Sequence, residues 1–389
     1  MTNVDQPARV RGAARLEGLG TTIFTEMTLL AQRTGAINLG QGFPDTDGPS
    51  EVIEAAVAAL RGGENQYAPL GGVPSLREAV LEHQRSYYGL DPEDVLVTFG
   101  ATEAIAAALL GLLNPGDEVV VLEPYYDSYA ACIAFAGARR RPVTLRPPEF
   151  ALDIDELQAA VGPRAKVLLL NTPQNPTGRV LGRDELEAIA RVCIEHDLVC
   201  VSDEVYEHLV YDGEHVPIAT FPGMAPRTLT ISSVGKSFSF TGWKIGWCSG
   251  PAELVAAVRG VKQYLTFAGG TPLQHAAAAA LRLPSAHLEA LRDELRAKRN
   301  LLCVGLTEAG LDPLTPAGTY FVNADVGADA GAFCATLPER CGVVAIPTSV
   351  FYDDAGAAPT LVRFAFCKRE DVIAEAARRL ARLAGSVRG

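Results

Sequence analysis

The sequence has no long apolar run and no excess of positive charge, and each absence excludes a class of protein. The most apolar helix-like run, residues 104–113, is too short to cross a bilayer, so no transmembrane segment is expected. The net charge of −12 leaves no broad cationic surface that would attract nucleic acid or an anionic membrane. The first twenty residues lack the uninterrupted apolar core of a secretory signal, which favours a cytoplasmic protein.

Paired cysteines and histidine motifs for metal binding are also missing. No two of the eight cysteines form a CysXXCys pair, and several lie inside apolar runs, so buried reduced thiols are expected. The six histidines form no HisGluXXHis motif and show no tight spacing with cysteine, so no metal site is expected. The cysteines are Cys132, Cys193, Cys200, Cys248, Cys303, Cys334, Cys341 and Cys367, and the histidines are His83, His196, His208, His215, His275 and His287.

Low-complexity spacers and internal repeats are absent as well, and the composition is that of a globular protein. With 389 residues and 48% hydrophobic content, the chain is long enough for two or three domains. Apolar strand-like runs alternate with helical patterns along much of the chain. This alternation is typical of an α/β fold in which helices cover both faces of a mainly parallel sheet.

Lys236 follows one of these strand-like runs. Residues 228–231 alternate β-branched and apolar side chains and predict a buried strand, while Ser232, Ser233 and Gly235 are turn formers that are expected to end it. Ligands bind at the carboxyl edge of open α/β sheets. An amine held there in a partly apolar pocket can have a lowered pKa and form a Schiff base with a carbonyl. A solvated surface lysine is the alternative interpretation.

Two further strand-like runs end in residues suited to binding an anion or a flat ring. Residues 95–99 lead through Ala101 and Thr102 into the helical pattern, so free amides at a helix N-terminus are expected to receive a phosphate. Residues 119–122 are soon followed by Tyr126, whose ring can stack on a flat ligand. Taken alone, Thr102 is equally well a helix cap and Tyr126 a core side chain.

Two more runs end in an amide and an acid. Residues 167–170 precede a loop that carries Asn175, and residues 198–201 precede Asp203 and Tyr206. Each has an ordinary alternative, a turn residue or a loop carboxylate. All these groups nevertheless fall at one edge of one predicted sheet. Pyridoxal phosphate requires a lysine for its aldehyde, an acid for its ring nitrogen and amides with cations for its phosphate, and the sequence supplies all three.

Several strings carry a specific resemblance. They are residues 38–45 (NLGQGFPD), 65–67 (NQY), 171–178 (NTPQNPTG), 202–206 (SDEVY), 228–247 around Lys236, and 362–368 (VRFAFCK). With them the chain, from about residue 15 onward, resembles the class I aminotransferases of the fold type I pyridoxal phosphate enzymes. The most similar subgroup comprises kynurenine and glutamine transaminases, methionine aminotransferases and probable N-succinyldiaminopimelate aminotransferases.

The resemblance implies roles around the cofactor ring. Lys236 holds the cofactor and then moves the proton between the substrate α-carbon and the cofactor. Asp203 pairs with the pyridinium nitrogen through a charge-assisted bond. Tyr206 and Asn175 hydrogen-bond the ring hydroxyl oxygen, and Tyr126 stacks on the ring.

The resemblance also implies a phosphate site. The amides of Ala101 and Thr102, together with Ser233 and Lys244, bind the phosphate, and Tyr67 reaches it from the other subunit of a homodimer. Many class I members have arginine where Lys244 stands; lysine keeps the charge but not the bidentate geometry.

For the substrate, the resemblance implies that Arg363 binds the α-carboxylate, helped by Asn175 and the backbone of Gly42. An arginine on a strand is otherwise usually solvated or paired. No motif for a second, side-chain-binding arginine is present, which suggests apolar or aromatic substrates, although succinylated ones stay open. The aromatic residues expected near the substrate are Phe24, Phe267 and Phe351.

The same resemblance implies a division into a large and a small domain. Residues 46–280 form the large cofactor-binding domain with its mainly parallel sheet, and residues 1–45 join residues 281–389 in a smaller α+β domain. Residues 276–280 and 288–299 are expected to be helical and to connect the two domains, with the charges of the second segment on a solvated face.

The expected function is a transaminase that works by a ping-pong cycle, in which an amino acid donates its amino group and a 2-oxo acid such as 2-oxoglutarate accepts it. A cysteine-S-conjugate β-lyase stays open, because it shares the early chemistry. A non-catalytic, cofactor-binding sensor is a second alternative, but fewer than about forty residues precede the NLGQG string, too few for an added DNA-binding domain. The physiological donor and acceptor, and the choice between lysine biosynthesis and general amino acid turnover, stay open.

Overall fold

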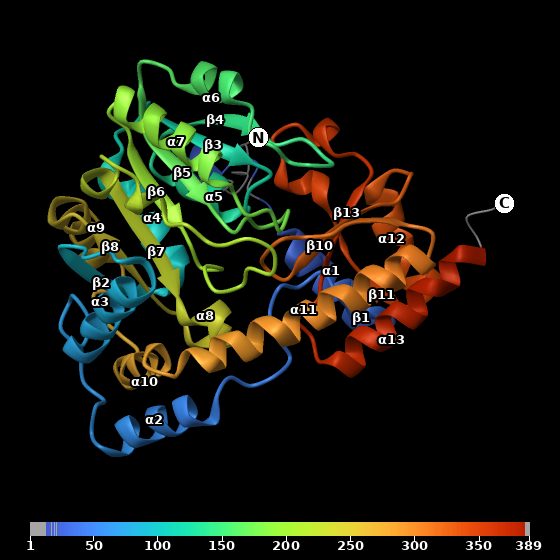
Figure 1. The fold of residues 1–389 in the computed structure, drawn as a ribbon, viewed down its shortest axis with the longest axis horizontal. Helices are drawn as coiled ribbons and strands as arrows, with labels where there is room; N and C mark the ends of the chain where they lie inside the picture. Colours follow the sequence, from blue (N-terminus) through green and yellow to red (C-terminus); the bar gives the residue numbers. More distant parts are fainter. Residues whose placement is uncertain (1–12, 17, 19, 21, 386–389) are drawn as a thin grey trace, which may run out of the picture.

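The computed structural model describes residues 13–16, 18, 20 and 22–385, and its largest element is a seven-stranded sheet (Figure 1). Strand β8 is antiparallel to both of its neighbours, and every other adjacent pair is parallel. The mainly parallel sheet expected from the sequence is therefore confirmed. In order across the sheet, the strands are β2 (Asp94–Phe99), β8 (Ile245–Gly250), β7 (Thr228–Ser233), β6 (Val199–Asp203), β5 (Ala165–Asn171), β3 (Glu118–Glu123) and β4 (Arg139–Thr144).

Helices cover both faces of this sheet because alternate strand residues are apolar on each side. In β5, Val167 and Leu169 pack in the core cluster that includes α4, whereas Leu168 and Leu170 pack in the cluster that includes α7. The helices of this part are α2 (Ser50–Arg61), α3 (Pro74–Tyr88), α4 (Gly100–Leu112), α5 (Ser128–Phe135), α6 (Ile154–Ala160), α7 (Arg183–Glu195), α9 (Ala252–Leu265) and α10 (Thr271–Leu281).

A second core combines the N-terminal segment with the last third of the chain. Leu39 packs in one cluster with Leu302, Phe364 and Ile373. The domain limits at residues 45 and 280 stay a prediction. The elements are α1 (Ile23–Thr34), α11 (Ser285–Glu308), α12 (Ala330–Cys341) and α13 (Glu370–Leu380), a parallel pair β1 (Ile37–Asn38) and β11 (Val343–Val344), and an antiparallel sheet of β12 (Ile346–Pro347), β13 (Leu361–Ala365), β10 (Phe321–Asp325) and β9 (Asp312–Leu314).

Helix α11 extends from the neighbourhood of α10 to the small sheet (Figure 1). Its helical character is confirmed, but the expectation of a solvated charged face is wrong for two of its cations. Lys298 is buried and pairs with Glu294, and Arg299 is buried and pairs with Asp212 at 2.5 Å while it donates to the carbonyl of Pro316 at 2.8 Å. The contacts of Arg299 attach α11 to segments outside the helix, whereas the Lys298–Glu294 pair lies within it.

The strand before Lys236 is longer than expected. Ser232 and Ser233 belong to β7 and pair with Trp247 and Gly246 of β8, so they do not form the turn that their residue types suggested. The chain then enters the short helix α8 (Val234–Ser237) that carries Lys236. Pairing with β8 overrides the turn propensity of serine.

The eight cysteines are all free thiols, as expected; seven are buried and Cys303 is half-buried. None of the described helices is both long enough and apolar enough to cross a membrane.

Candidate active site

The carboxyl ends of the parallel strands open into a cavity of about 380 Å³ between the two cores. Every site residue predicted from the sequence lines this cavity except Tyr67, Phe267 and Phe351. The cavity residues that were predicted are Phe24, Gly42, Ala101, Thr102, Tyr126, Asn175, Asp203, Tyr206, Ser233, Lys236, Lys244 and Arg363.

Lys236 lies in the cavity with little hydrogen bonding. Its Nζ is 3.5 Å from the carbonyl oxygen of Gly42 and 5.7 and 5.6 Å from the ring centroids of Tyr206 and Tyr320. Burial is the main cause that lowers the pKa of Lys236 to about 8. About a tenth of this amine is therefore uncharged at pH 7 and able to attack a carbonyl, far more than for a solvated lysine.

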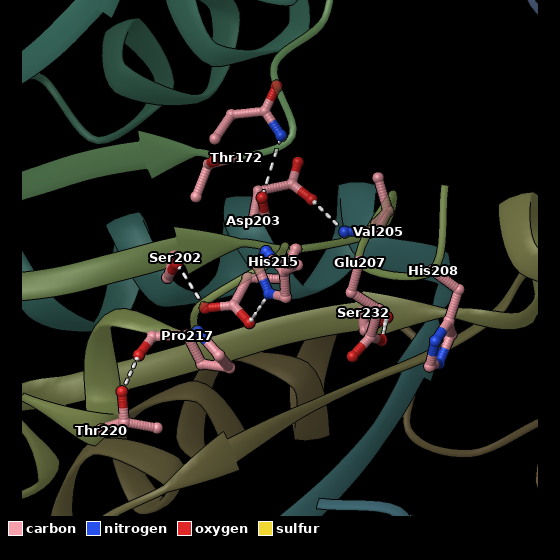
Figure 2. A network of polar contacts seen from close by, with 12 residues as sticks. Thr172, Ser202, Asp203, Val205, Glu207, His208, His215, Pro217, Thr220 and Ser232 are labelled. Carbon is pink, nitrogen blue, oxygen red and sulfur yellow. Dashed lines mark hydrogen bonds and ion pairs between the residues drawn. The ribbon is translucent and has the colours of Figure 1, made fainter. Parts of the chain in front are cut away.

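Asp203, at the end of β6, is the buried acid of the site. Its Oδ2 accepts the hydroxyl of Tyr129 at 2.6 Å, and its Oδ1 accepts the backbone N–H of Val205 at 3.3 Å, as Figure 2 shows for the second bond. Burial raises the pKa of Asp203 to about 6, although these two hydrogen bonds and the nearby Lys236 oppose the rise. A cationic ring nitrogen would meet a fixed, poorly solvated carboxylate here.

The first turn of α4 also lines the cavity and offers groups that suit an anion. Gly100 has a φ of +70°, and the amides of Ala101 and Thr102 belong to the first turn, where N–H groups have no partner within the helix. The Nζ of Lys244 is 3.5 Å from Oγ1 of Thr102. Together with the partial positive charge of the helix N-terminus, these groups suit a phosphate.

Arg363, on β13, is completely buried and held in place by two hydrogen bonds. It donates to Oδ1 of Asn175 at 2.8 Å and to the carbonyl oxygen of Gly40 at 2.9 Å, while its Nε has no partner among the described residues. Its guanidinium lies 4.1 Å from the ring centroid of Phe321 and 4.7 Å from that of Phe351. Burial lowers the pKa of Arg363 to about 10, so it remains a cation that lacks a carboxylate partner.

One wall of the cavity is aromatic. The ring centroid of Phe24, on α1, lies 6.5 Å from that of Tyr126 and 6.1 Å from that of Phe351. Phe351 is buried behind Phe24 and does not line the cavity itself. The side-chain amide of Gln41 donates to the carbonyl of Phe24 and so fixes the start of α1 beside the cavity.

Comparisons with known proteins agree on one family. Residues 34–380 match the family model described as aminotransferase class I and II. The chain is 52% identical to the probable N-succinyldiaminopimelate aminotransferase DapC of Mycobacterium tuberculosis, over 95% of this chain and 98% of that protein. It is 42% identical to the methionine aminotransferase of Escherichia coli, over 95% and 98% of the two chains.

Solved structures agree with this result. The three-dimensional structure of N-succinyldiaminopimelate aminotransferase from Mycobacterium tuberculosis matches with a TM-score of 0.94 and 53% identity, over 96% of this chain and 100% of that one. The chain belongs to the class I and II aminotransferases. This aminotransferase has the fold type I architecture, and its cofactor is pyridoxal phosphate.

The cavity of the aminotransferase fits this cofactor. An amine with a lowered pKa, a buried acid and a helix N-terminus with a lysine lie around one space, as an aldehyde, a ring nitrogen and a phosphate require. Gly246 supports the fit, because a Cβ there would come within 2.6 Å of the carbonyl carbon of Gly100. A larger residue would displace the first turn of α4.

Tyr67 and Phe267 do not line the cavity of their own chain. Tyr67 is 80% exposed and Phe267 is 43% exposed, and their rings meet edge to face with centroids 5.5 Å apart. Neither Phe267 nor Phe351 lines the cavity of a single chain, so their place near the substrate stays a prediction. Phe351 contacts both Phe24 and the guanidinium of Arg363, and Phe267 faces the surface.

Sequence reasoning missed several residues of the site. Tyr129 is the clearest, since its hydroxyl bonds the Asp203 carboxylate, and Tyr320 donates to the carbonyl of Gly42 at 2.7 Å. Thr241 also lines the cavity. The one available signal for Tyr129 was its spacing of three residues from Tyr126, which places both on one face of a helical turn.

Proposed function

We propose that this aminotransferase transfers the amino group of an amino acid with an apolar or aromatic side chain, of glutamine, or of an N-succinyldiaminopimelate type substrate to a 2-oxo acid such as 2-oxoglutarate, by a ping-pong cycle. The supporting observation is the combination of one completely buried arginine, Arg363, with an aromatic wall that includes Phe24 and Tyr126. Among the described residues that line the cavity, Arg363 is the one arginine, so one carboxylate has a clear partner there.

In this proposal different residues bind the substrate carboxylate, protonate the cofactor ring and move the substrate proton. The substrate α-carboxylate binds to Arg363, whose guanidinium is already oriented by Asn175 and Gly40. Bound pyridoxal phosphate supplies a carbonyl carbon and an electron-withdrawing ring. Asp203 keeps a proton on the ring nitrogen, and the amine of Lys236 moves the proton at the substrate α-carbon.

The remaining predicted contacts fix the position of the cofactor ring and phosphate. Tyr206 and Asn175 donate hydrogen bonds to the ring hydroxyl oxygen, and Tyr126 covers one face of the ring. The first turn of α4, Ser233 and Lys244 bind the phosphate. Burial raises the pKa of Tyr206 well above its usual value, so its phenol remains a hydrogen-bond donor at neutral pH.

A homodimer is part of the proposal, in the cytoplasm and without nucleic acid or membrane partners. Tyr67 extends from the surface with a hydroxyl that no group of its own cavity uses, which suits a phosphate contact across a subunit interface. Phe267 lies beside it and would enter the same interface.

The test of the covalent attachment is a Lys236→Ala substitution, with Lys166→Ala on the exposed face of β5 as its control. Borohydride reduction followed by peptide mass mapping should fix the cofactor to Lys236 in the wild type and in the control. The Lys236→Ala protein should retain cofactor through its phosphate contacts but lose turnover. Near-normal turnover of Lys236→Ala, or labelling of another side chain, would refute the assignment.

A substrate panel tests the specificity and separates the two reaction types. Turnover coupled to 2-oxoglutarate is measured with methionine, glutamine, kynurenine, phenylalanine and N-succinyldiaminopimelate. A cysteine conjugate is added without any 2-oxo acid, and pyruvate and ammonia are assayed. Transfer from an apolar, aromatic or succinylated donor is expected; pyruvate formation as the main reaction would instead indicate a β-lyase.

A further inference from the structure

A cluster of histidine and glutamate lies next to the active site but outside its cavity. Glu207 and His208 directly follow Tyr206 in the chain, yet neither lines the cavity. His83 comes from α3, and it is 125 positions away from His208. Figure 2 shows Glu207 and His208 beside Ser232 of β7, separate from the Asp203 carboxylate. Folding thus unites groups whose spacing in the sequence suggested no metal site.

The donor atoms of the cluster converge. One nitrogen each of His83 and His208 and one carboxylate oxygen of Glu207 all lie within 4.8 Å of one another. It is the one such group of three or more histidine, cysteine or acidic residues among the residues that the structure describes. The two Nε2 atoms are 2.7 Å apart. Since two donors cannot face each other at this distance, one of these nitrogens is unprotonated and accepts the N–H of the other.

The negative charge of Glu207 has incomplete compensation. Its Oε1 accepts the hydroxyl of Ser232 at 2.6 Å, but its Oε2 is buried and has no hydrogen-bond partner among the described residues. The described part of the chain offers Glu207 no ion pair with lysine or arginine. The phenol of Tyr88 also faces this carboxylate.

The chemistry of the donor set suits ligation. Imidazole nitrogens and carboxylate oxygens are both common ligands of divalent transition metals. A buried carboxylate oxygen without a hydrogen-bond partner, such as Oε2 of Glu207, is costly unless a cation joins it.

We propose that His83, Glu207 and His208 bind one divalent transition-metal ion, of which Zn²⁺ is the best match, with solvent or Tyr88 in the remaining position. Two imidazoles and a carboxylate form a donor set that is typical of zinc in proteins. Tetrahedral coordination at 2.0–2.1 Å places two nitrogens about 3.3 Å apart, so the two Nε2 atoms must separate by about 0.6 Å. Rotation of the side chains provides this movement.

The ion would link two segments behind the active site, α3 and the turn after β6. Glu207 follows Tyr206 directly and lies four residues after Asp203, His83 belongs to α3, and Ser232 of β7 hydrogen-bonds Glu207. Metal binding therefore positions the turn that presents Asp203 and Tyr206 to the cofactor. The ion itself does not reach the cavity.

The experiment uses tag-free holoenzyme, freed of metal by a chelator and titrated with Co²⁺ or Zn²⁺ alone. One equivalent of Co²⁺ per chain should produce visible d–d bands, which Zn²⁺ should abolish by displacement, and Zn²⁺ should raise the melting temperature by mass action. His83→Gln and Glu207→Gln should lose this equivalent and the thermal shift. His196→Gln, at the exposed end of α7, is the matched control and should keep both.

Two outcomes would overturn the proposal. The first is a wild type that takes up no Co²⁺ with visible bands, which would leave a hydrogen-bonded cluster. The second is equal uptake by His83→Gln and His196→Gln, which would place the ion on thiols or the cofactor. A measurement without variants guards against misfolding: equilibrium dialysis of the chelator-treated wild type against Zn²⁺, followed by metal analysis, should find one bound equivalent per chain. Binding well below one equivalent also counts against the site.

Discussion

At the residue scale, burial shifts the pKa values of Lys236 and Asp203 in opposite directions. The pKa of the lysine falls to about 8 and that of the aspartate rises to about 6, so both groups lose charge relative to solvent. A lowered pKa makes the amine of Lys236 a better nucleophile, and the poorly solvated carboxylate of Asp203 favours binding of a cation. The cavity therefore suits a ligand with an electrophilic carbonyl near Lys236 and a positive ring nitrogen near Asp203.

The shift of Lys236 predicts how cofactor uptake depends on pH. With a pKa of about 8 instead of 10.5, the uncharged share of this amine rises from about 1% at pH 6 to about half at pH 8. The rate of covalent cofactor capture by the apoenzyme, followed by stopped-flow absorbance, should therefore increase with pH and level off above about 8. N-acetyl-lysine amide is the control and should show its midpoint near 10. An equally high midpoint for the protein would contradict the lowered pKa.

Arg363→Lys tests whether the buried guanidinium of Arg363 binds the substrate carboxylate. Lysine keeps the charge but loses the two fixed hydrogen bonds to Asn175 and Gly40 and the planar contact with Phe321. We expect KM for every amino donor to rise roughly 10- to 100-fold, equivalent to about 1.4–2.8 kcal/mol, with an unchanged cofactor spectrum. Arg191→Lys, on the exposed face of α7, should leave KM unaltered. Unaltered KM in Arg363→Lys would assign the carboxylate to another group.

The functional roles of some site residues could be predicted from the sequence, and those of others could not. Lys236 and Asp203 follow buried strand-like runs, where a charged side chain has few structural reasons to occur, so their positions were informative. In the sequence Tyr129 cannot be told from an ordinary core residue. Its hydrogen bond to Asp203 depends on how α5 packs against the sheet. The cluster around Glu207 shows the same limit, because its members come from distant segments.

At the scale of elements, the close contact between β8 and α4 shapes the phosphate site. A Cβ on Gly246 would lie 2.6 Å from the carbonyl carbon of Gly100 and 2.8 Å from the amide nitrogen of Ala101. Both neighbours are backbone atoms, so the first turn of α4 would have to move. The glycine therefore sets the position of the amides that receive the phosphate.

Gly246→Ala should weaken cofactor binding through this displacement. Overpacking costs roughly 1–3 kcal/mol, so we expect the dissociation constant of pyridoxal phosphate to rise about tenfold or more. Cofactor titration monitored by absorbance measures the effect. Gly260→Ala, in α9 with no atom within 4 Å of the added Cβ, should leave affinity intact and gain about 0.5–1 kcal/mol of stability. Equal affinities in the two variants would disprove the role of this contact.

Elements were predictable where burial and periodicity agree. Four of the five strands that end at the cavity contain a continuous apolar run, as a doubly covered sheet favours, whereas β7 alternates threonine with apolar residues. The failures occur where tertiary contacts decide: pairing with β8 extends β7 through Ser233, and the ion pair with Asp212 holds the buried Arg299. Neither β8 nor Asp212 is adjacent in sequence to the segment it contacts.

At the scale of the whole molecule, exposed aromatic side chains gather near the end of α9. Tyr264 is 84% exposed, and Leu265, Phe267 and the highly exposed Tyr67 accompany it. Large apolar side chains are rarely so exposed together unless a partner covers them. A second copy of the chain is the proposed partner, and the sequence could indicate it only through the family resemblance, since no pattern within one chain specifies a symmetric contact.

Hybrid dimers test whether Tyr67 completes the site of the other subunit. Chains with Lys236→Ala and chains with Tyr67→Ala are co-expressed with different tags, and the hybrid is purified. One of its two sites would combine the intact Lys236 of one chain with the intact Tyr67 of the other, so we expect about half of the wild-type activity. Each homodimer should have less: Lys236→Ala none, and Tyr67→Ala a reduced rate because a phosphate contact is lost.

The matched control pairs Lys236→Ala with Asp203→Ala. Both residues line the cavity of a single chain, so in this hybrid each site carries one of the two defects and no complementation should occur. Absence of any gain in the Tyr67 hybrid over the mean of its two homodimers would mean that Tyr67 does not act across the interface. A Tyr67→Ala homodimer with full activity would remove the phosphate contact from the proposal, because the cavity of each chain would then be sufficient by itself.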